Sequence, residues 1–214
     1  MKKTLLLVSL CLSSGLLWAD SYTVKSPSEN IIVNVETGEK TTYSVVFNGK
    51  QVLNPSPISM TFDNGLVIGR NMEVTDVKRF SENNVLTPVV RQKSATIEDH
   101  YNEMVLGADG YQLHFRVYDD GLAYRFQTSL KDSLKVLGEE AVFCFPEDYN
   151  TLFPEERTML SAQQPLFKPM KLSEIRSEQY CSTPVLIKLT DEARMLISES
   201  DLESYPGMFL KKQG

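Results

Sequence analysis

The chain has 214 residues, of which 42% are hydrophobic and 23% are charged, enough apolar content for the packed core of one ordinary domain. This composition excludes an intrinsically disordered chain. The formal net charge of −6 leaves no general basic surface of the kind that binds nucleic acids or anionic membranes non-specifically. A neutral ligand such as a sugar fits this charge better.

Residues 1–19 have the three parts of a secretory signal peptide: a basic start, a short apolar run and a small residue, Ala19, at the expected cleavage point. We therefore expect a mature domain of residues 20–214 in the periplasm or outside the cell. A membrane anchor is less favoured, because polar residues at 13–15 interrupt a segment already short for a span. A lipid-bearing cysteine at Cys11 is a second alternative.

Short runs of alternating apolar and polar residues, separated by turn residues, recur along the mature chain and predict an all-β domain. The first predicted strands span 31–36 and 42–47. Asn48-Gly49 is a strong signal for a hairpin that leads into a strand at 50–53. We expect Asn54-Pro-Ser-Pro57 to break this series of strands.

A further turn at Asp63-Asn-Gly65 precedes two predicted strands at 85–92 and 94–106. Near the end of the chain, segments 185–189 and 194–198 predict another pair of strands. At about eight to twelve residues per strand and turn, this spacing is typical of a β-sandwich.

The segment 115–126 predicts a β-hairpin with an arginine on the polar face of each strand. If Asp120-Gly121 is the two-residue turn, Arg116 lies directly opposite Arg125. Two opposed guanidinium groups repel each other, so we expect a carboxylate between them in a structural ion network. Two acidic residues of the preceding predicted strand are the candidates, Asp99 and Glu103. The alternative is that the arginines contact substrate hydroxyls or another domain.

Three sequence words carry a family resemblance: Arg-Val-Tyr-Asp-Asp-Gly-Leu-Ala-Tyr-Arg at 116–125, His-Tyr-Asn-Glu at 100–103, and Ile-Ser-Glu-Ser-Asp-Leu at 197–202 with Tyr-Pro-Gly-Met at 205–208. From about Tyr22 to its last residue, the chain resembles the N-terminal domain of glycoside hydrolase family 97. The resemblance implies a β-super-sandwich of the galactose-mutarotase type, placed before a (β/α)8 catalytic barrel in Bacteroidetes α-glucosidases and α-galactosidases. Because that super-sandwich is longer, we expect the chain to be truncated at its C-terminal end.

The resemblance also implies a metal ligand. Glu199 is similar to a family glutamate that supplies a carboxylate to an active-site Ca²⁺, whose other ligands come from the barrel. Because Ca²⁺ takes about six to eight oxygens, we expect the isolated chain to bind it weakly or not at all. Without the resemblance, Glu199 would be interpreted as a surface acid at a turn.

No residue of the chain is predicted to be catalytic, and no substrate-binding residue is assigned. Glycoside hydrolysis generally needs two carboxyl groups placed across the bond, and the resemblance implies that both belong to the barrel. The adjacent Asp119 and Asp120 are explained by a turn. His100 and His114 are too few for a zinc site.

Two features remain open. Segment 146–182 lacks clear alternation and predicts a long loop, which either packs against the barrel or is solvated and partly mobile. Cys144 and Cys181 could pair in an oxidising compartment, but Cys144 lies in an apolar run, 142–145, where a buried free thiol fits equally well.

We therefore expect a carbohydrate-binding domain that completes the active site of a calcium-dependent glycoside hydrolase acting on α-glucosides or α-galactosides, and that is inactive alone. Its partners would be the carbohydrate substrate and the catalytic barrel, with neither nucleic acid nor a transmembrane anchor. The alternative is a stand-alone carbohydrate-binding or structural β-sandwich module without catalysis. A binding module exposes aromatic rings for sugar stacking, and three tyrosines are candidates: Tyr43, Tyr111 and Tyr118.

Overall fold

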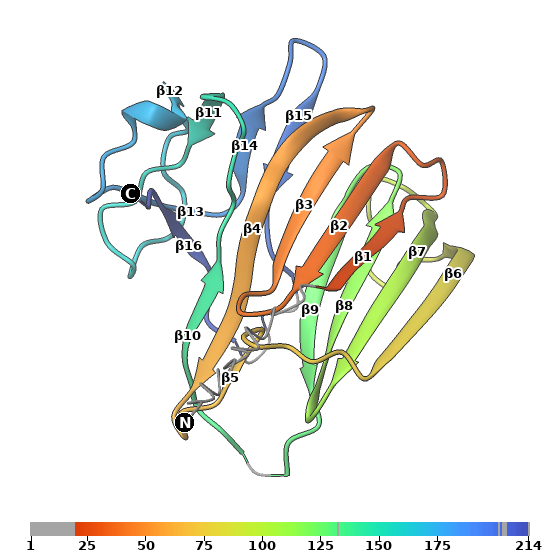
Figure 1. The fold of residues 1–214 in the computed structure, drawn as a ribbon. Helices are drawn as coiled ribbons and strands as arrows, with labels where there is room; N and C mark the ends of the chain where they lie inside the picture. Colours follow the sequence, from red (N-terminus) through yellow and green to blue (C-terminus); the bar gives the residue numbers. More distant parts are fainter. Residues whose placement is uncertain (1–19, 132, 201, 203–204, 214) are drawn as a thin grey trace, which may run out of the picture. The chain divides into compact units, whose positions relative to one another are not determined.

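The computed structural model describes residues 20–131, 133–200, 202 and 205–213, so the predicted signal peptide, with Cys11 and Ala19, lies outside the described residues. The described chain consists of β-strands and turns, with one short 3-10 helix, η1 (Leu172–Glu174), which confirms the all-β prediction (Figure 1). It divides into two compact units. Unit 1 is Met1–Tyr43 with Pro57–Val142, and unit 2 is Ser44–Ser56 with Phe143–Gly214.

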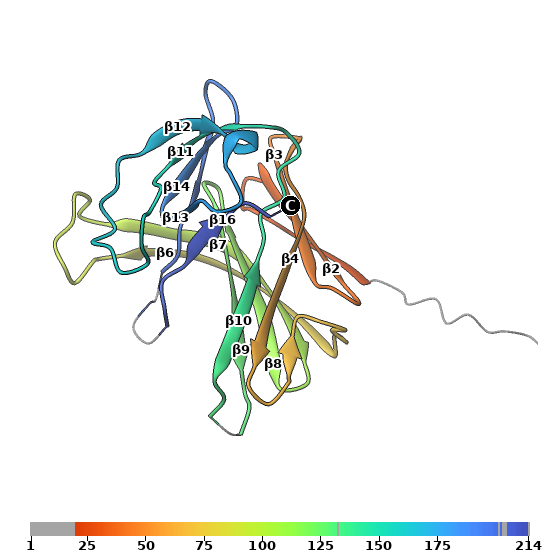
Figure 2. The same ribbon diagram turned by 90° about the vertical axis from the view of Figure 1, so that its left-hand side faces the viewer.

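Unit 1 contains most of the long strands. They are β1 (Asp20–Lys25), β2 (Ile31–Thr37), β5 (Val67–Ile68), β6 (Asp76–Leu86), β7 (Ile97–Ala108), β8 (Tyr111–Tyr118), β9 (Leu122–Thr128) and β10 (Val136–Ala141). Strands β3 (Thr42–Phe47) and β4 (Lys50–Phe62) run through both units. One antiparallel sheet has the order β6-β7-β8-β9, and a second has the order β1-β2-β3-β4-β10, with β5 beside β4. Figure 2 shows β10 beside β4, to which it is hydrogen-bonded.

The core of unit 1 lies between these two sheets, as expected for a β-sandwich. Alternate residues of β8 are fully buried, among them Leu113, Phe115 and Val117, and they share the core with Val33 and Val35 of β2. Burying each of these side chains contributes about 1.5–3 kcal/mol. The period-two pattern of the sequence therefore identifies the faces of these strands correctly.

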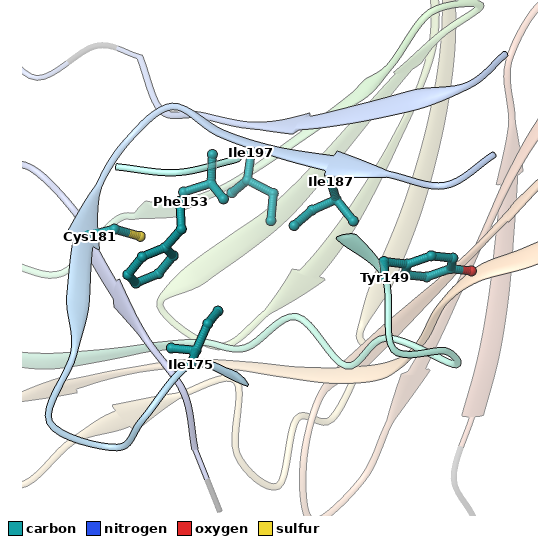
Figure 3. Close-up of a cluster of buried hydrophobic side chains, with 7 residues drawn as sticks. Tyr149, Phe153, Ile175, Cys181, Ile187 and Ile197 are labelled. Atoms are coloured by element: carbon teal, nitrogen blue, oxygen red, sulfur yellow. The ribbon is translucent and has the colours of Figure 1, made fainter. Parts of the chain in front are cut away.

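Unit 2 is built from short strands. They are β11 (Asn150–Phe153), β12 (Lys168–Lys171), β13 (Tyr180–Ser182), β14 (Val185–Lys188), β15 (Arg194–Ile197) and β16 (Phe209–Lys211). One sheet has the order β12-β11-β14-β15, and β13 pairs with β16. Figure 3 shows their buried cluster, which consists of Tyr149, Phe153, Ile175, Cys181, Val185, Ile187 and Ile197.

The prediction of a long loop at 146–182 is therefore wrong. This segment supplies three strands and η1, and Tyr149, Phe153, Ile175 and Cys181 belong to the core of unit 2. The three strands of this segment have only three or four residues each, and the sequence shows no clear alternation in them.

Strand β4 continues through Asn54-Pro-Ser-Pro57, where we expected a break. Proline lacks an N–H group, but its carbonyl still accepts hydrogen bonds. Val142 N–H donates to the Pro57 carbonyl at 3.2 Å, and Asn54 N–H donates to the Cys144 carbonyl at 2.7 Å. The prediction of a strand at 85–92 is also wrong. The strand in this region, β6, begins at Asp76 and ends at Leu86.

Cys144 and Cys181 are both free thiols. Cys181 is fully buried in the core of unit 2, and burial raises the pKa of its thiol to about 12. Cys144 is partly exposed, and its segment forms a single bridge to Asn54 rather than a strand. Packing, and not a disulfide, therefore holds these two segments in unit 2.

Candidate functional site

Glu199 lies just after β15, in unit 2, where its carboxylate joins three segments of the chain. Its Oε1 atom accepts a hydrogen bond from the Met208 N–H at 2.6 Å and another from the Thr183 hydroxyl at 3.2 Å. A Cβ atom on Gly207 would lie 3.6 Å from the same oxygen, which is an ordinary van der Waals distance. Hydrogen bonds to a charged acceptor are stronger than neutral ones, and these two fix the orientation of the carboxylate.

The two segments of the third sequence word that carried the resemblance meet at this point. Glu199 belongs to the segment at 197–202, and Gly207 and Met208 belong to the segment at 205–208. Asp201 lies outside the described residues. Thr183 was not predicted, because a single threonine before a proline carries no sequence signal for such a contact.

The described residues do not form a complete metal site. Among them, no group of three or more His, Cys, Asp or Glu side chains comes together to hold an ion. Glu199 offers one carboxylate, and the hydrogen bonds from Met208 and Thr183 both go to its Oε1 atom. Since Ca²⁺ takes about six to eight oxygens, Glu199 can be at most one of several ligands.

The polar face of β7 and β8, in unit 1, carries an ion network centred on the buried carboxylate of Glu103. Glu103 Oε2 accepts from Arg116 Nε at 3.1 Å, and Oε1 lies 2.8 Å from His114 Nδ1. Arg116 also lies over the ring of Tyr101, with its guanidinium carbon 4.5 Å from the ring centre. Of the two predicted acids, Glu103 is the one that pairs with Arg116, so the prediction of an acidic partner is confirmed for this arginine.

The two arginines are not directly opposite, so this part of the prediction is wrong. Arg116 lies opposite Ala123, and Arg125 lies opposite His114. Arg125 donates to Gln127 at 3.3 Å, and no carboxylate within the described residues forms an ion pair with it. The other predicted acid, Asp99, accepts from the Tyr118 hydroxyl at 3.2 Å.

The register differs because the hairpin turn is Asp119-Asp120 rather than Asp120-Gly121. The Tyr118 N–H donates to the Gly121 carbonyl at 2.8 Å. The Ser28 hydroxyl and N–H both donate to the Asp119 carboxylate, at 2.7 and 2.8 Å, and hold the pKa of Asp119 below its usual value. Asp119 is therefore explained by the structure of the turn, as predicted.

The candidate tyrosines do not form an exposed platform for sugar stacking. Tyr43 and Tyr111 are buried, and Tyr43 packs against Phe115 with ring centres 5.8 Å apart. Tyr118 is half-buried against Tyr101, with ring centres 5.1 Å apart. A stand-alone module that stacks sugars on these rings therefore has no support from the structure.

The described residues contain no helix that is long and apolar enough to cross a membrane.

Comparisons of the sequence and comparisons of the fold both find proteins of the same family. The profile of the family described as Glycosyl-hydrolase 97 N-terminal matches residues 24–214. A retaining alpha-galactosidase of Bacteroides thetaiotaomicron is 32% identical over 219 residues, which cover 98% of this chain and 33% of the relative. The chain thus spans about a third of the length of that curated relative.

Solved structures share the fold. A glycoside hydrolase family 97 enzyme from Pseudoalteromonas sp. strain K8, in complex with panose, matches with a TM-score of 0.78 and 20% identity, covering 90% of this chain and 30% of that one. A beta-arabinopyranosidase matches with a TM-score of 0.68 and 24% identity, covering 84% of this chain and 31% of that one.

Proposed function

Because this chain belongs to the N-terminal domain family of glycoside hydrolase family 97, we propose that it completes the active site of a calcium-dependent hydrolase of α-glucosides or α-galactosides. In this proposal, Glu199 supplies one carboxylate to Ca²⁺. The other ligands and both catalytic carboxyl groups belong to a (β/α)8 barrel domain, which is the partner of this chain. No residue of the chain itself is catalytic.

The hydrogen bonding of Glu199 is the observation that carries the proposal. A carboxylate that merely ended a strand at the surface would be free to change rotamer, whereas the Met208 N–H and the Thr183 hydroxyl hold one oxygen of Glu199 in place. Among the described residues, none is seen to donate to the second oxygen, Oε2, which can therefore bind a ligand. A bound Ca²⁺ supplies a fixed positive charge that can polarise a substrate oxygen.

The proposal also covers the secretion of the chain and the boundaries of its domain. Residues 1–19 direct the chain to the periplasm or outside the cell and are removed near Ala19. Residues 20–214 then act as one β-sandwich domain that contributes to carbohydrate binding beside the barrel. N-terminal sequencing of the secreted protein tests this, and a mature protein that still begins at Met1 contradicts it.

A chimeric enzyme tests the function. Residues 20–214 replace the matching third of the Bacteroides thetaiotaomicron retaining alpha-galactosidase, and hydrolysis of p-nitrophenyl α-galactoside and α-glucoside is measured with Ca²⁺ or with a chelator. We expect activity from the chimera in Ca²⁺, and none from the isolated chain. Circular dichroism confirms that each protein is folded.

The matched variants are Glu199→Gln and Glu192→Gln, which remove one carboxylate charge each. Glu192 lies in the exposed turn between β14 and β15. We expect the chimera to lose activity with Glu199→Gln and to keep it with Glu192→Gln. A folded chimera that is equally active with both variants contradicts the role of Glu199, and turnover by the isolated chain means that it contains a catalytic pair.

A further inference from the structure

Strand β6 is an open edge of unit 1. It lies at the end of the sheet β6-β7-β8-β9, and all of its residues from Asp76 to Leu86 are exposed (Figure 1). Its only strand partner within the described residues is β7, so the main-chain groups of its other edge have no strand beside them. A long exposed edge strand is a template for pairing with another strand.

Strand β1, at the end of the second sheet of unit 1, is an edge that side chains cover. At β1, Arg79 Nη1 donates to the Thr23 carbonyl at 2.7 Å, and Asn102 Nδ2 donates to the Lys25 carbonyl at 2.9 Å. These side chains occupy carbonyl groups that another strand would need. The outer edge of β6 has no such cover within the described residues, so β6 is the edge that is available for pairing.

The side chains of β6 are complementary to themselves. Lys78, Phe80 and Glu82 lie on one face of the strand, because successive residues alternate. If β6 pairs antiparallel with β6 of a second copy so that Phe80 lies opposite Phe80, then Lys78 of each copy lies opposite Glu82 of the other. The Phe80 side chain is 50% exposed and would be covered by this pairing.

We propose that two copies of this chain associate through their β6 edges, around a two-fold axis at Phe80, and form a continuous eight-stranded antiparallel sheet. A second copy fits better than an unrelated strand, because both the aromatic contact and the two pairs of opposite charges come from the same short sequence. Lys78 lies 3.1 Å from Asp76 of its own strand, but both side chains are half exposed, and such a pair exchanges partners at little cost. The proposal is independent of the catalytic role.

Analytical ultracentrifugation of the mature chain tests the association. A pairing of this kind is a small interface, so the concentration should extend to about 1 mM. We expect a monomer–dimer equilibrium in the wild type. In the dimer, each of the single variants Lys78→Glu and Glu82→Lys places two pairs of like charges opposite each other. Each variant should therefore raise the dissociation constant of the dimer about tenfold or more. The double variant restores opposite charges and should recover the wild-type dissociation constant.

Lys131→Glu and Glu192→Lys are the matched controls, because they make the same changes in charge at exposed positions outside β6. We expect neither to change the dissociation constant. A protein that stays monomeric at every concentration overturns the proposal. In that case, β6 would be available to pair with another domain or another protein. A dimer that resists both single reversals, or a double variant that is not rescued, overturns it as well.

Discussion

Replacing Arg116 by leucine removes the exposed partner of the buried Glu103 carboxylate and leaves the apolar contact with Tyr101 largely in place. The Glu103 side chain is only 8% exposed, whereas that of Arg116 is 41% exposed. The variant loses the Arg116 Nε donor at 3.1 Å and the cation over the Tyr101 ring at 4.5 Å. His114, 2.8 Å from Oε1, remains as the second partner of Glu103.

The cost follows from these contacts. A hydrogen bond to a charged group contributes about 1.5–3 kcal/mol, and an exposed cation–π contact about 0.5–1 kcal/mol. Solvent screens the partly exposed Arg116, so we expect Arg116→Leu to lower the free energy of unfolding by about 2 kcal/mol. For a chain of this length, that corresponds to a decrease in Tm of about 4–8 °C.

Arg125→Leu is the matched control. Arg125 lies on the same polar face, but it is exposed and donates only to Gln127 among the described residues. We expect it to change stability by less than about 0.5 kcal/mol. Both variants are compared by thermal and urea unfolding at pH 7, followed by circular dichroism. If Arg116→Leu and Arg125→Leu unfold at the same temperature, Glu103 does not depend on Arg116 and our account of this network is wrong.

Two further predictions concern single side chains. The pKa of Asp119 is lower in the folded protein than its usual value of 3.8. Ionised Asp119 therefore stabilises the fold at pH values above 3.8, and this stabilisation is lost as the pH falls through the lower pKa of the folded state. Asp119→Asn should therefore lower Tm at pH 7 more than Asp120→Asn, and the difference should shrink in acid; equal Tm values at pH 7 would refute this. The pKa of the Cys181 thiol is raised to about 12, so Cys181 should resist a thiol reagent at pH 8 while Cys144 reacts. Peptide mapping identifies the labelled cysteine. Rapid labelling of Cys181 in the native protein would show that its segment is not packed as described.

Local turn chemistry explains which hairpins the sequence predicts correctly. Asn48 and Gly49 have positive φ angles of 49° and 78°, as the Asn-Gly pattern predicts. Asp120-Gly121 has a similar pattern, yet the turn forms one residue earlier, where Ser28 and Asn30 bind Asp119 from another part of the chain. Local propensity cannot anticipate a contact between residues so distant in sequence.

The error in register leaves the faces of the hairpin unchanged. Moving the turn by one residue changes each cross-strand partner by two positions, so Arg116 and Arg125 stay on the polar face and Phe115 stays in the core. For this reason, an acidic partner for Arg116 on the preceding strand was predictable, although the residue opposite Arg116 was not.

The sequence predicts β14 and β15, but it is less informative for the rest of unit 2 and for β6. The strands of unit 2 are short, and the cluster around Phe153 and Cys181 is assembled from segments with no period of their own. Strand β6 is exposed on both faces and therefore lacks alternation. Glu199 was identified only through a family resemblance, and its partner Thr183 was found only in the structure.

The central claim is that Glu199 supplies a carboxylate to a calcium ion shared with a catalytic domain. Calorimetric titration of Ca²⁺ into the chimeric enzyme measures this directly, without relying on turnover. Our account predicts that Glu199→Gln weakens Ca²⁺ binding about tenfold or more, whereas Glu192→Gln leaves it unchanged. Equal Ca²⁺ affinities for the folded chimera and for its Glu199→Gln variant would contradict it.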